Sequence, residues 1–201
     1  MDQYFEQLLM DYALAEAEGE RKRIEKLLWH DFGRRKLVFV LDMSGFSLLT
    51  RKYGVVHYLS LVKRMQLTAR PIIEEHNGLV VKFEADNCFA MFDTALSAVR
   101  AAIQLNTAFE AMNVHADDPF DIRISIGMDY GDVLLTGGPD YFGDTVNRAS
   151  KLGEDVAGPG EIILTEAAFA QLPSQAGFRG QPLEISIAGV QLKAVNLAYG
   201  R

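Results

Sequence analysis

Cysteine is almost absent from this sequence, and its scarcity excludes two kinds of site. The single Cys88 cannot form an intramolecular disulfide, nor supply the several thiolates of a cysteine-based zinc site. Long apolar runs are missing too: no stretch reaches the ~18 residues that a membrane-spanning helix needs. The start, MDQYFEQLLMDYALAEAEGE, carries acids where a signal peptide would carry basic residues. We therefore expect a cytoplasmic protein with no membrane partner.

Positive charge is also in short supply. The chain has 20 Lys and Arg against 27 Asp and Glu, which gives a formal net charge of -7 at pH 7. Because a phosphate backbone attracts clustered Lys and Arg, we expect no nucleic-acid partner. A small anionic ligand would need a few local cations or a metal ion.

What the chain does have is enough apolar material for a sizeable core. With 201 residues, 49% of them hydrophobic, it fits one globular domain with an appendage. Residues 2 to about 31 place apolar side chains at helical spacing on either side of Gly19. They predict one or two amphipathic helices, which either pack on the domain or form a dimerisation or signal-relay pair. We therefore divide the chain into a helical segment, 1–35, and a domain, 36–201.

The domain alternates between strand and helix patterns. A buried strand at 36–42 is followed by a helix at about 55–76, a turn at Asn77–Gly78 and a hairpin that turns at 84–87. This order predicts an α+β fold: a ferredoxin-like βαββαβ core with extra strands and helices, and with the helices on one face. The further expected elements are a helix at 94–112, a half-buried alternating strand at 120–135, a helix that begins after Asp140, a turn and strand at 158–165, a short helix at 166–172, and two strands within 183–199 joined at 188–191.

Two aspartates occupy positions where carboxylates can meet. Asp42 ends the first strand and Asp86 lies in the turn of the hairpin, so the inferred topology brings both to one edge of the sheet. Mg²⁺ prefers one or two carboxylates and takes its remaining ligands from water and substrate phosphates. Gly45 would let the backbone approach a phosphate closely. Alternatively, Asp42 caps a turn and Asp86 fills a common turn position; taking both aspartates together, we favour metal binding.

The segment DYFGDTVNRASK raises a second possibility. Asn147 and Lys151 lie four residues apart, on one face of the expected helix, where they could share an anionic ligand. The alternatives are an asparagine that bonds the local backbone and a solvated lysine. Lys82 likewise has a plain interpretation as a strand-edge lysine whose ammonium lies in water.

Four stretches in order carry a resemblance to a known family. They are FVLDMSGFS, VVKFEADNCFAMF, IRISIGMDYGDVLL and DYFGDTVNRASKLGEDVAGPGEIILT. They resemble the successive motifs of the class III nucleotide (adenylate/guanylate) cyclase catalytic domain, from about Lys36 to Leu172. The resemblance implies that 36–201 is a cyclase homology domain and a phosphorus–oxygen lyase, which converts a nucleoside triphosphate to its 3',5'-cyclic monophosphate and pyrophosphate. It also implies a homodimer with active sites at the interface.

On the metal side of such a site, the resemblance assigns two groups of residues. Asp42 and Asp86 match the two metal-binding aspartates, which implies two Mg²⁺ or Mn²⁺ ions per site. The following loop matches the one that holds metal and triphosphate through backbone groups, and it consists of Met43, Ser44, Gly45 and Phe46.

On the nucleotide side, the resemblance assigns four residues of the partner chain. Lys82 and Asp140 match the residues that recognise the base, and this pair implies ATP as substrate and cAMP as product. Asn147 matches the asparagine that orients the ribose. Lys151 falls where the family usually has the arginine that stabilises the transition state.

The sequence departs from the family pattern at three positions. Lys151 replaces an arginine and loses its planar fork, Ala85 stands where glycine is common, and Ala188 stands where many members have a triphosphate-binding lysine. Two alternatives therefore stay open: a cyclase that uses GTP or a pyrimidine nucleotide (giving cyclic CMP or UMP), and a weak pseudo-cyclase that acts as a nucleotide-binding or dimerising regulator.

Overall fold

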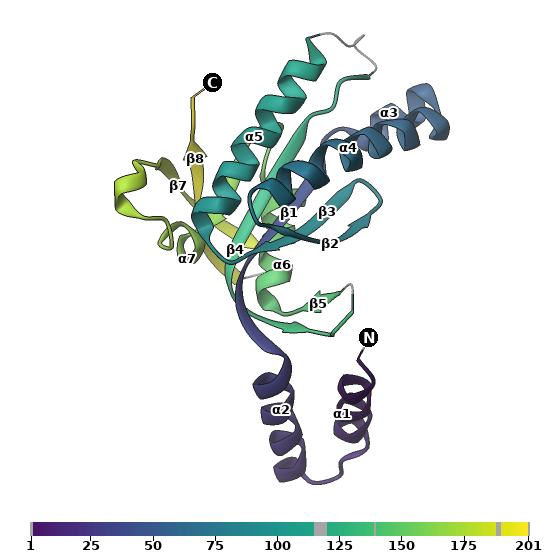
Figure 1. Cartoon of the computed structure of the whole chain (residues 1–201), viewed down its shortest axis with the longest axis vertical. Coiled ribbons are helices and arrows are strands. Elements are labelled where there is room, and N and C mark those ends of the chain that lie inside the picture. Colours follow the sequence, from purple (N-terminus) through teal and green to yellow (C-terminus); the bar gives the residue numbers. More distant parts are fainter. Residues whose placement is uncertain (1, 115–119, 139, 188–189, 201) are drawn as a thin grey trace.

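One mixed sheet runs through the middle of the domain (Figure 1). The structure, a computed structural model, describes residues 2–114, 120–138, 140–187 and 190–200. Within these ranges eight strands form the sheet in the order β2-β3-β1-β4-β6-β8-β7, and β5 pairs with β4. The strands are β1 (Gly33–Met43), β2 (Leu79–Glu84), β3 (Asn87–Phe92), β4 (Ile124–Leu135), β5 (Tyr141–Phe142), β6 (Ile162–Thr165), β7 (Arg179–Ile187) and β8 (Val190–Ala198).

The predicted βαββαβ core is confirmed. Strands β1, β2, β3 and β4 lie in the spatial order β2-β3-β1-β4, and every pair among them is antiparallel. The crossovers are α4 (Val55–Glu75) between β1 and β2, and α5 (Ala95–Asn113) between β3 and β4. The sequence did not predict α3 (Phe46–Tyr53), a separate short helix that ends at Gly54, whose φ of 88° is left-handed. The turn that joins β7 to β8, at 188–189, lies outside the described residues.

The helices cover both faces of the sheet, which corrects the expectation of a single helical face. Leu37, Phe39 and Leu41 of β1 pack in the cluster that α4 and α5 cover. Val38 and Val40 point the other way and pack with Ala149 of α6 (Asp144–Lys151). The remaining helical elements are a π-helical turn (Leu152–Val156), α7 (Glu166–Phe169) and a 3-10 turn (Ser174–Ala176).

Strand β4 shows the effect of this double cover. We expected an alternating, half-buried strand, but its first six residues, Ile124–Asp129, are all buried. The reason is that α5 covers one face of this strand's region and α6 packs directly on the other. A strand covered on both faces loses the period-two alternation of burial.

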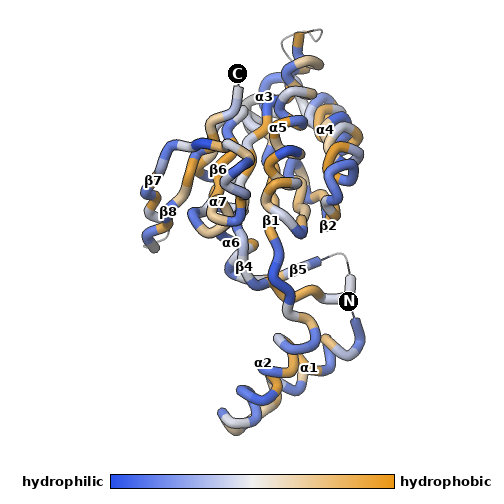
Figure 2. Tube along the Cα trace, turned by 60° about the vertical axis from the view of Figure 1, so that its left-hand side comes forward, coloured by the Kyte–Doolittle hydropathy of each residue, from blue (hydrophilic) through white to orange (hydrophobic). Residues whose placement is uncertain are grey.

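Two helices, α1 (Gln3–Leu14) and α2 (Glu18–Phe32), form the expected N-terminal pair as a hairpin that stands out from the sheet (Figures 1 and 2). Phe5 contacts Phe32 edge-to-face, at 5.0 Å between ring centroids. The hairpin is tied to the domain where the Asp2 backbone N–H donates to the Thr136 carbonyl oxygen at 2.8 Å. Within the described residues, Leu134 of β4 is the domain side chain that joins the apolar cluster of the hairpin, and Leu14 remains 72% exposed. No helix in the described ranges combines the length and apolar character needed to cross a bilayer.

Helix α6 approaches β4 unusually closely, because glycine occupies the contact. A Cβ added at Gly127 would lie 2.2 Å from the Ala149 carbonyl oxygen and 2.3 Å from the Gly153 nitrogen. Both are backbone atoms, which cannot rotate out of the way. The depth at which α6 sits on the sheet therefore depends on the absence of a side chain at Gly127.

We predict that Gly127→Ala destabilises the fold by about 2–3 kcal/mol, the cost of overpacking a close contact. The measurement is the free energy of unfolding from urea denaturation. Gly19→Ala is the matched control, because a Cβ there meets nothing within 4 Å. In a helix that change adds up to about 1 kcal/mol of stability. Equal midpoints for Gly127→Ala and the parent would show that α6 does not sit as close as described.

Candidate active site

Asp42 and Asp86 come together at the end of the sheet that the sequence predicted. Asp42 is the penultimate residue of β1, and Asp86 lies in the turn between β2 and β3. Burial, and next the charge of Asp86 and of Glu154, raise the pKa of Asp42 to about 7. Burial also raises the pKa of Asp86, although a hydrogen bond from Tyr58 works in the opposite direction. Each carboxylate therefore sits where a neighbouring cation would be favourable.

The turn that carries Asp86 is strained at the residue before it. Ala85 adopts a φ of 52°, in the left-handed region that glycine adopts without a penalty. For a residue with a Cβ this conformation costs roughly 1–2 kcal/mol. The chain therefore keeps the turn geometry that a glycine would give, at a cost in backbone strain. Ala188, the third departure, lies outside the described residues.

The predicted phosphate loop, Met43–Phe46, offers mainly backbone groups. The Met43 side chain is buried in the core, at 2% exposure. The Ser44 N–H donates to the Arg123 carbonyl oxygen at 2.8 Å, so this amide is already used. Gly45 has a left-handed φ of 85°, and no atom lies within 4 Å of the position that a Cβ would take. Phe46 begins α3, and its side chain falls outside what the structure describes.

Lys82 and Asp140, far apart in the sequence, meet across the sheet. The Lys82 Nζ lies 3.4 Å from Asp140 Oδ1 and 3.0 Å from Glu84 Oε2. It also sits 5.2 Å from the centroid of the Phe89 ring. The hydrogen bond that Lys82 donates to Glu84 is the largest contribution that raises the pKa of Lys82, ahead of the charge of Asp140. Lys82 therefore contacts two carboxylates, Glu84 as well as the predicted Asp140.

Glu84 was missed, although a signal for it was present. Residues two apart on a strand point to the same face, so Lys82 and Glu84 had to be neighbours once β2 was recognised. Tyr58 was also missed, and there the sequence offers no comparable signal. Its position over Asp86 depends on how α4 crosses the sheet.

The helix α6 presents Asn147 and Lys151 at its surface. Both side chains are exposed, and Lys151 Nζ lies 2.8 Å from Asp155 Oδ2. The hydrogen bond that Lys151 donates to Asp155 raises the pKa of Lys151, which stays a cation at neutral pH. Arg148, the other cation of this helix, is held elsewhere: its Nε donates to Asp129 Oδ2 at 2.7 Å. Lys151 is therefore the cation of α6 that a ligand can reach without breaking a buried ion pair.

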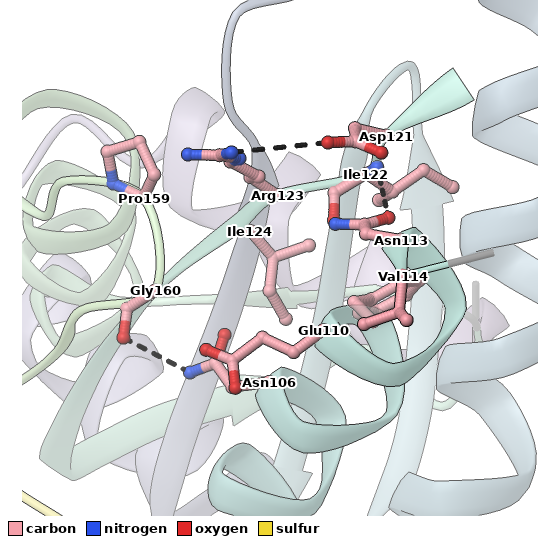
Figure 3. A pocket seen from close by; sticks show the side chains of 11 residues that line it. Asn106, Glu110, Asn113, Val114, Asp121, Ile122, Arg123, Ile124, Pro159 and Gly160 are labelled. Carbon is pink, nitrogen blue, oxygen red and sulfur yellow. Dashed lines mark hydrogen bonds and ion pairs between the residues drawn. The ribbon is translucent and has the colours of Figure 1, made fainter. Parts of the chain in front are cut away.

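A cavity of about 430 Å³ is lined by other residues, although Arg123, one of them, accepts the hydrogen bond from the Ser44 N–H (Figure 3). It opens between the end of α5, the start of β4 and the Pro159–Gly160 turn, and Asn106 closes one side through a hydrogen bond to the Gly160 carbonyl oxygen. None of the predicted site residues lines it. In the part of the chain that the structure describes, no three His, Cys, Asp or Glu side chains are grouped to hold a metal ion. Asp42 and Asp86 alone would leave most ligand positions to other groups.

The raised pKa of Asp42 predicts how the metal-free fold responds to pH. The folded-state value is about 7 and the ordinary value 3.8, so the folded chain binds this proton more tightly. The stability that protonated Asp42 contributes is therefore fully present below about pH 4 and is lost as pH rises to about 7. We expect Asp42→Asn to raise the thermal midpoint at pH 8 and to change it little at pH 4, in circular dichroism melts with EDTA. Asp11→Asn, on α1, is the control; a gain of equal size at both pH values would contradict the assignment.

Comparison with known proteins identifies the family to which this chain belongs. Residues 35–195 match the model of the "Adenylate and Guanylate cyclase catalytic domain". The adenylate cyclase of Streptomyces coelicolor is 30% identical over 138 residues, which cover 69% of this chain and 34% of that protein. The adenylate cyclase of Streptomyces griseus is 31% identical over 138 residues, covering 69% and 32%. The chain thus spans between 23% and 34% of the length of the curated relatives that it matches.

The fold agrees with this match. The crystal structure of the adenylyl cyclase CyaB from P. aeruginosa superposes with a TM-score of 0.71, over 84% of this chain and 97% of that one, at 19% identity. A likeness at this identity shows the fold alone, and here the fold is the α+β sheet that the motifs predicted. Because the family model covers most of the sequence, this chain belongs to the adenylate and guanylate cyclase catalytic domain family, class III.

Proposed function

We propose that this protein is a nucleotide cyclase that converts ATP to 3',5'-cyclic AMP and pyrophosphate, at sites shared by two copies of the chain. The observation that carries the proposal is the pair of aspartates at the end of the sheet. Asp42 and Asp86 are close enough for the charge of one to raise the pKa of the other. Two like charges held together in a fold are stabilised by a cation between them.

The donor set fits Mg²⁺ or Mn²⁺. Asp42 and Asp86 offer carboxylate oxygens, and the loop after Asp42 adds backbone oxygens, all of which are hard ligands that suit these ions. When bound, such ions neutralise phosphate charge and lower the pKa of the ribose hydroxyl that attacks the α-phosphorus. The chain's own part is to hold the triphosphate at the Gly45 turn and to keep the aspartates facing it.

The Lys82–Asp140 pair supports adenine as the base. The ammonium donates, which suits an adenine ring nitrogen, and the carboxylate accepts, which suits the exocyclic amino group. The two are 3.4 Å apart, so a donor and an acceptor stand side by side before a ligand arrives. The names of the two Streptomyces relatives agree with ATP as substrate.

One observation favours GTP as a second substrate. Glu84 places another acceptor next to Lys82, at 3.0 Å. The edge of guanine presents one acceptor and two donors, which a lysine flanked by carboxylates can match. Comparing all four nucleoside triphosphates in one assay therefore tests the substrate directly.

Two chains are needed because the charged residues fall into two clusters. The charges that act on Lys82 come from Glu84 and Asp140, whereas those that act on Asp42 come from Asp86, Glu154 and Asp155. A site that joins the metal aspartates to Lys82 is completed by the partner in a two-fold dimer, and the family resemblance assigns Asn147 and Lys151 to the partner as well. Asn147 would then orient the ribose and Lys151 would bind the α-phosphate.

The proposal predicts that the purified chain with Mn²⁺ forms a cyclic nucleotide and pyrophosphate, most rapidly from ATP, as followed by chromatography of all four reactions. Asp42→Ala and Asn147→Ala should each abolish turnover. Mixed in equal amounts, they should recover about a quarter of the parent rate, because half of the dimers are mixed and each holds one intact site.

Three outcomes separate the parts of this proposal. No cyclic product from any nucleotide, or full turnover by Asp42→Ala, would contradict the proposal that this chain is a nucleotide cyclase. Turnover by the parent without recovery in the mixture would place Asp42 and Asn147 in one chain's site. Saturable binding of ATP without product would support the nucleotide-binding regulator.

Lys151 generates a separate prediction, since an arginine fork can hold two phosphate oxygens and an ammonium is a point charge. We expect Lys151→Arg to raise kcat roughly ten-fold through one more charge-assisted hydrogen bond in the transition state. The measurement is the initial rate at saturating ATP. Lys22→Arg makes the same swap within the Glu18–Lys22 pair on α2 and should leave kcat unchanged. An unaltered rate for Lys151→Arg would count against its role at the phosphate.

A further inference from the structure

Asn87 stands directly beside the two aspartates. It is the first residue of β3, follows Asp86 in the chain, and is the register partner of Asp42 on β1. Two residues that face each other across an antiparallel pair have Cβ atoms about 4.5–5.5 Å apart, on the same face of the sheet. That face is the one on which Val40 and Phe89 pack, two residues along each strand.

The side-chain oxygen of Asn87 is buried and lacks a donor. Among the buried side-chain nitrogen and oxygen atoms in the described ranges, Asn87 Oδ1 is the one without a hydrogen-bond partner. Buried polar atoms in folded proteins nearly always have a partner, so an unsatisfied one needs an explanation. The nearest charged groups do not provide it, because Asp42 and Asp86 only accept hydrogen bonds when they are ionised.

The β1–β3 pairing thus places three side chains that carry oxygen acceptors at one end of the sheet, and the oxygen of Asn87 has no donor among the described residues. This arrangement is unfavourable for a protein surface left to itself, and it is what a hard divalent cation requires. An amide oxygen is neutral, so it adds a ligand without adding to the negative charge that Glu154 already brings close to Asp42. A carboxylate at position 87 would increase that repulsion.

We infer that Asn87 Oδ1 is a third oxygen donor of the divalent cation site that Asp42 and Asp86 form, either bound to the ion or accepting from a water on it. The inference rests on the metal-binding part of the proposed function. It is independent of whether the bound nucleotide is cyclised, and of which base is used.

The test is Mn²⁺ affinity, measured without nucleotide by the loss of the free-ion electron paramagnetic resonance signal at pH 8, above the pKa of about 7 of Asp42. Asn87→Leu keeps the volume and removes the oxygen. We expect its dissociation constant for Mn²⁺ to rise roughly ten-fold, the scale of one good ligand contact. Asn87→Asp keeps an oxygen and should bind Mn²⁺ at least as well as the parent.

A second readout separates a ligand from a structural asparagine. Removing an unsatisfied buried acceptor should raise the thermal midpoint of metal-free Asn87→Leu, so stability and affinity should move in opposite directions. Asn113→Leu is the matched control: it loses two hydrogen bonds to Ile122, at 2.9 Å each, and should melt earlier with unchanged Mn²⁺ affinity.

Each result decides the matter. An Asn87→Leu variant that binds Mn²⁺ like the parent overturns the inference while leaving the cyclase intact, and would mean that an ordinary water satisfies the amide. A parent that binds no Mn²⁺ overturns both. If the parent binds Mn²⁺, Asn87→Leu binds it more weakly and neither forms a cyclic nucleotide, the result supports Asn87 as a metal ligand and contradicts the proposed cyclase activity.

Discussion

The contact between α6 and β4 is the constraint on which the rest of the site depends. Gly127 lets the helix backbone touch the strand, and an ion pair then fixes its rotation. Asp129, 1% exposed, accepts from Arg148 Nε at 2.7 Å and from the Tyr130 N–H at 2.8 Å. A buried charge without such partners is strongly unfavourable, so the helix has one position in which the pair is complete. That position turns Asn147 and Lys151 outward.

The same contact shapes the electrostatics at the aspartates. The π-helical turn that follows α6 lies against β4 and carries Glu154 toward Asp42. Negative charge accumulates there, and hydrogen bonds from the backbone N–H of Asp86 and from Tyr58 lower the pKa of Asp86 only in part. Charge of one sign, concentrated by the fold and exposed to a ligand, is a common property of functional sites. Here the concentrated negative charge around Asp42 and Asp86 favours the binding of a cation at this end of the sheet.

Within one chain, Lys82 and Asp42 lie in separate charge clusters, whereas Lys151 lies beside Asp155, whose charge acts on Asp42. In the free chain Lys82 is held by Glu84 and Asp140, and Lys151 is held by Asp155. These are partly exposed pairs, which are individually weak and which a polyphosphate or a base can replace. The cavity beside Asn106 and Arg123 has no part in this arrangement.

The sequence by itself determined the order of the elements, the βαββαβ core and the family. These follow from hydrophobic periodicity and from short sequence motifs, both of which are formed by residues close together in the chain. Asp42 and Asp86 were expected to meet, and they do, because β1 and the β2–β3 hairpin are neighbours in that topology. The boundary at residue 35 and the roles of the site residues stay predictions.

What only the tertiary structure decided concerns contacts between elements distant in the sequence. The burial of β4 on both faces, Tyr58 over Asp86, and Arg148 in a buried ion pair all follow from how helices cross the sheet. The unsatisfied oxygen of Asn87 is the clearest case. An asparagine after an aspartate is an ordinary turn sequence, and only the pairing of β1 with β3 places it opposite Asp42, where its side-chain oxygen has no hydrogen-bond partner among the described residues.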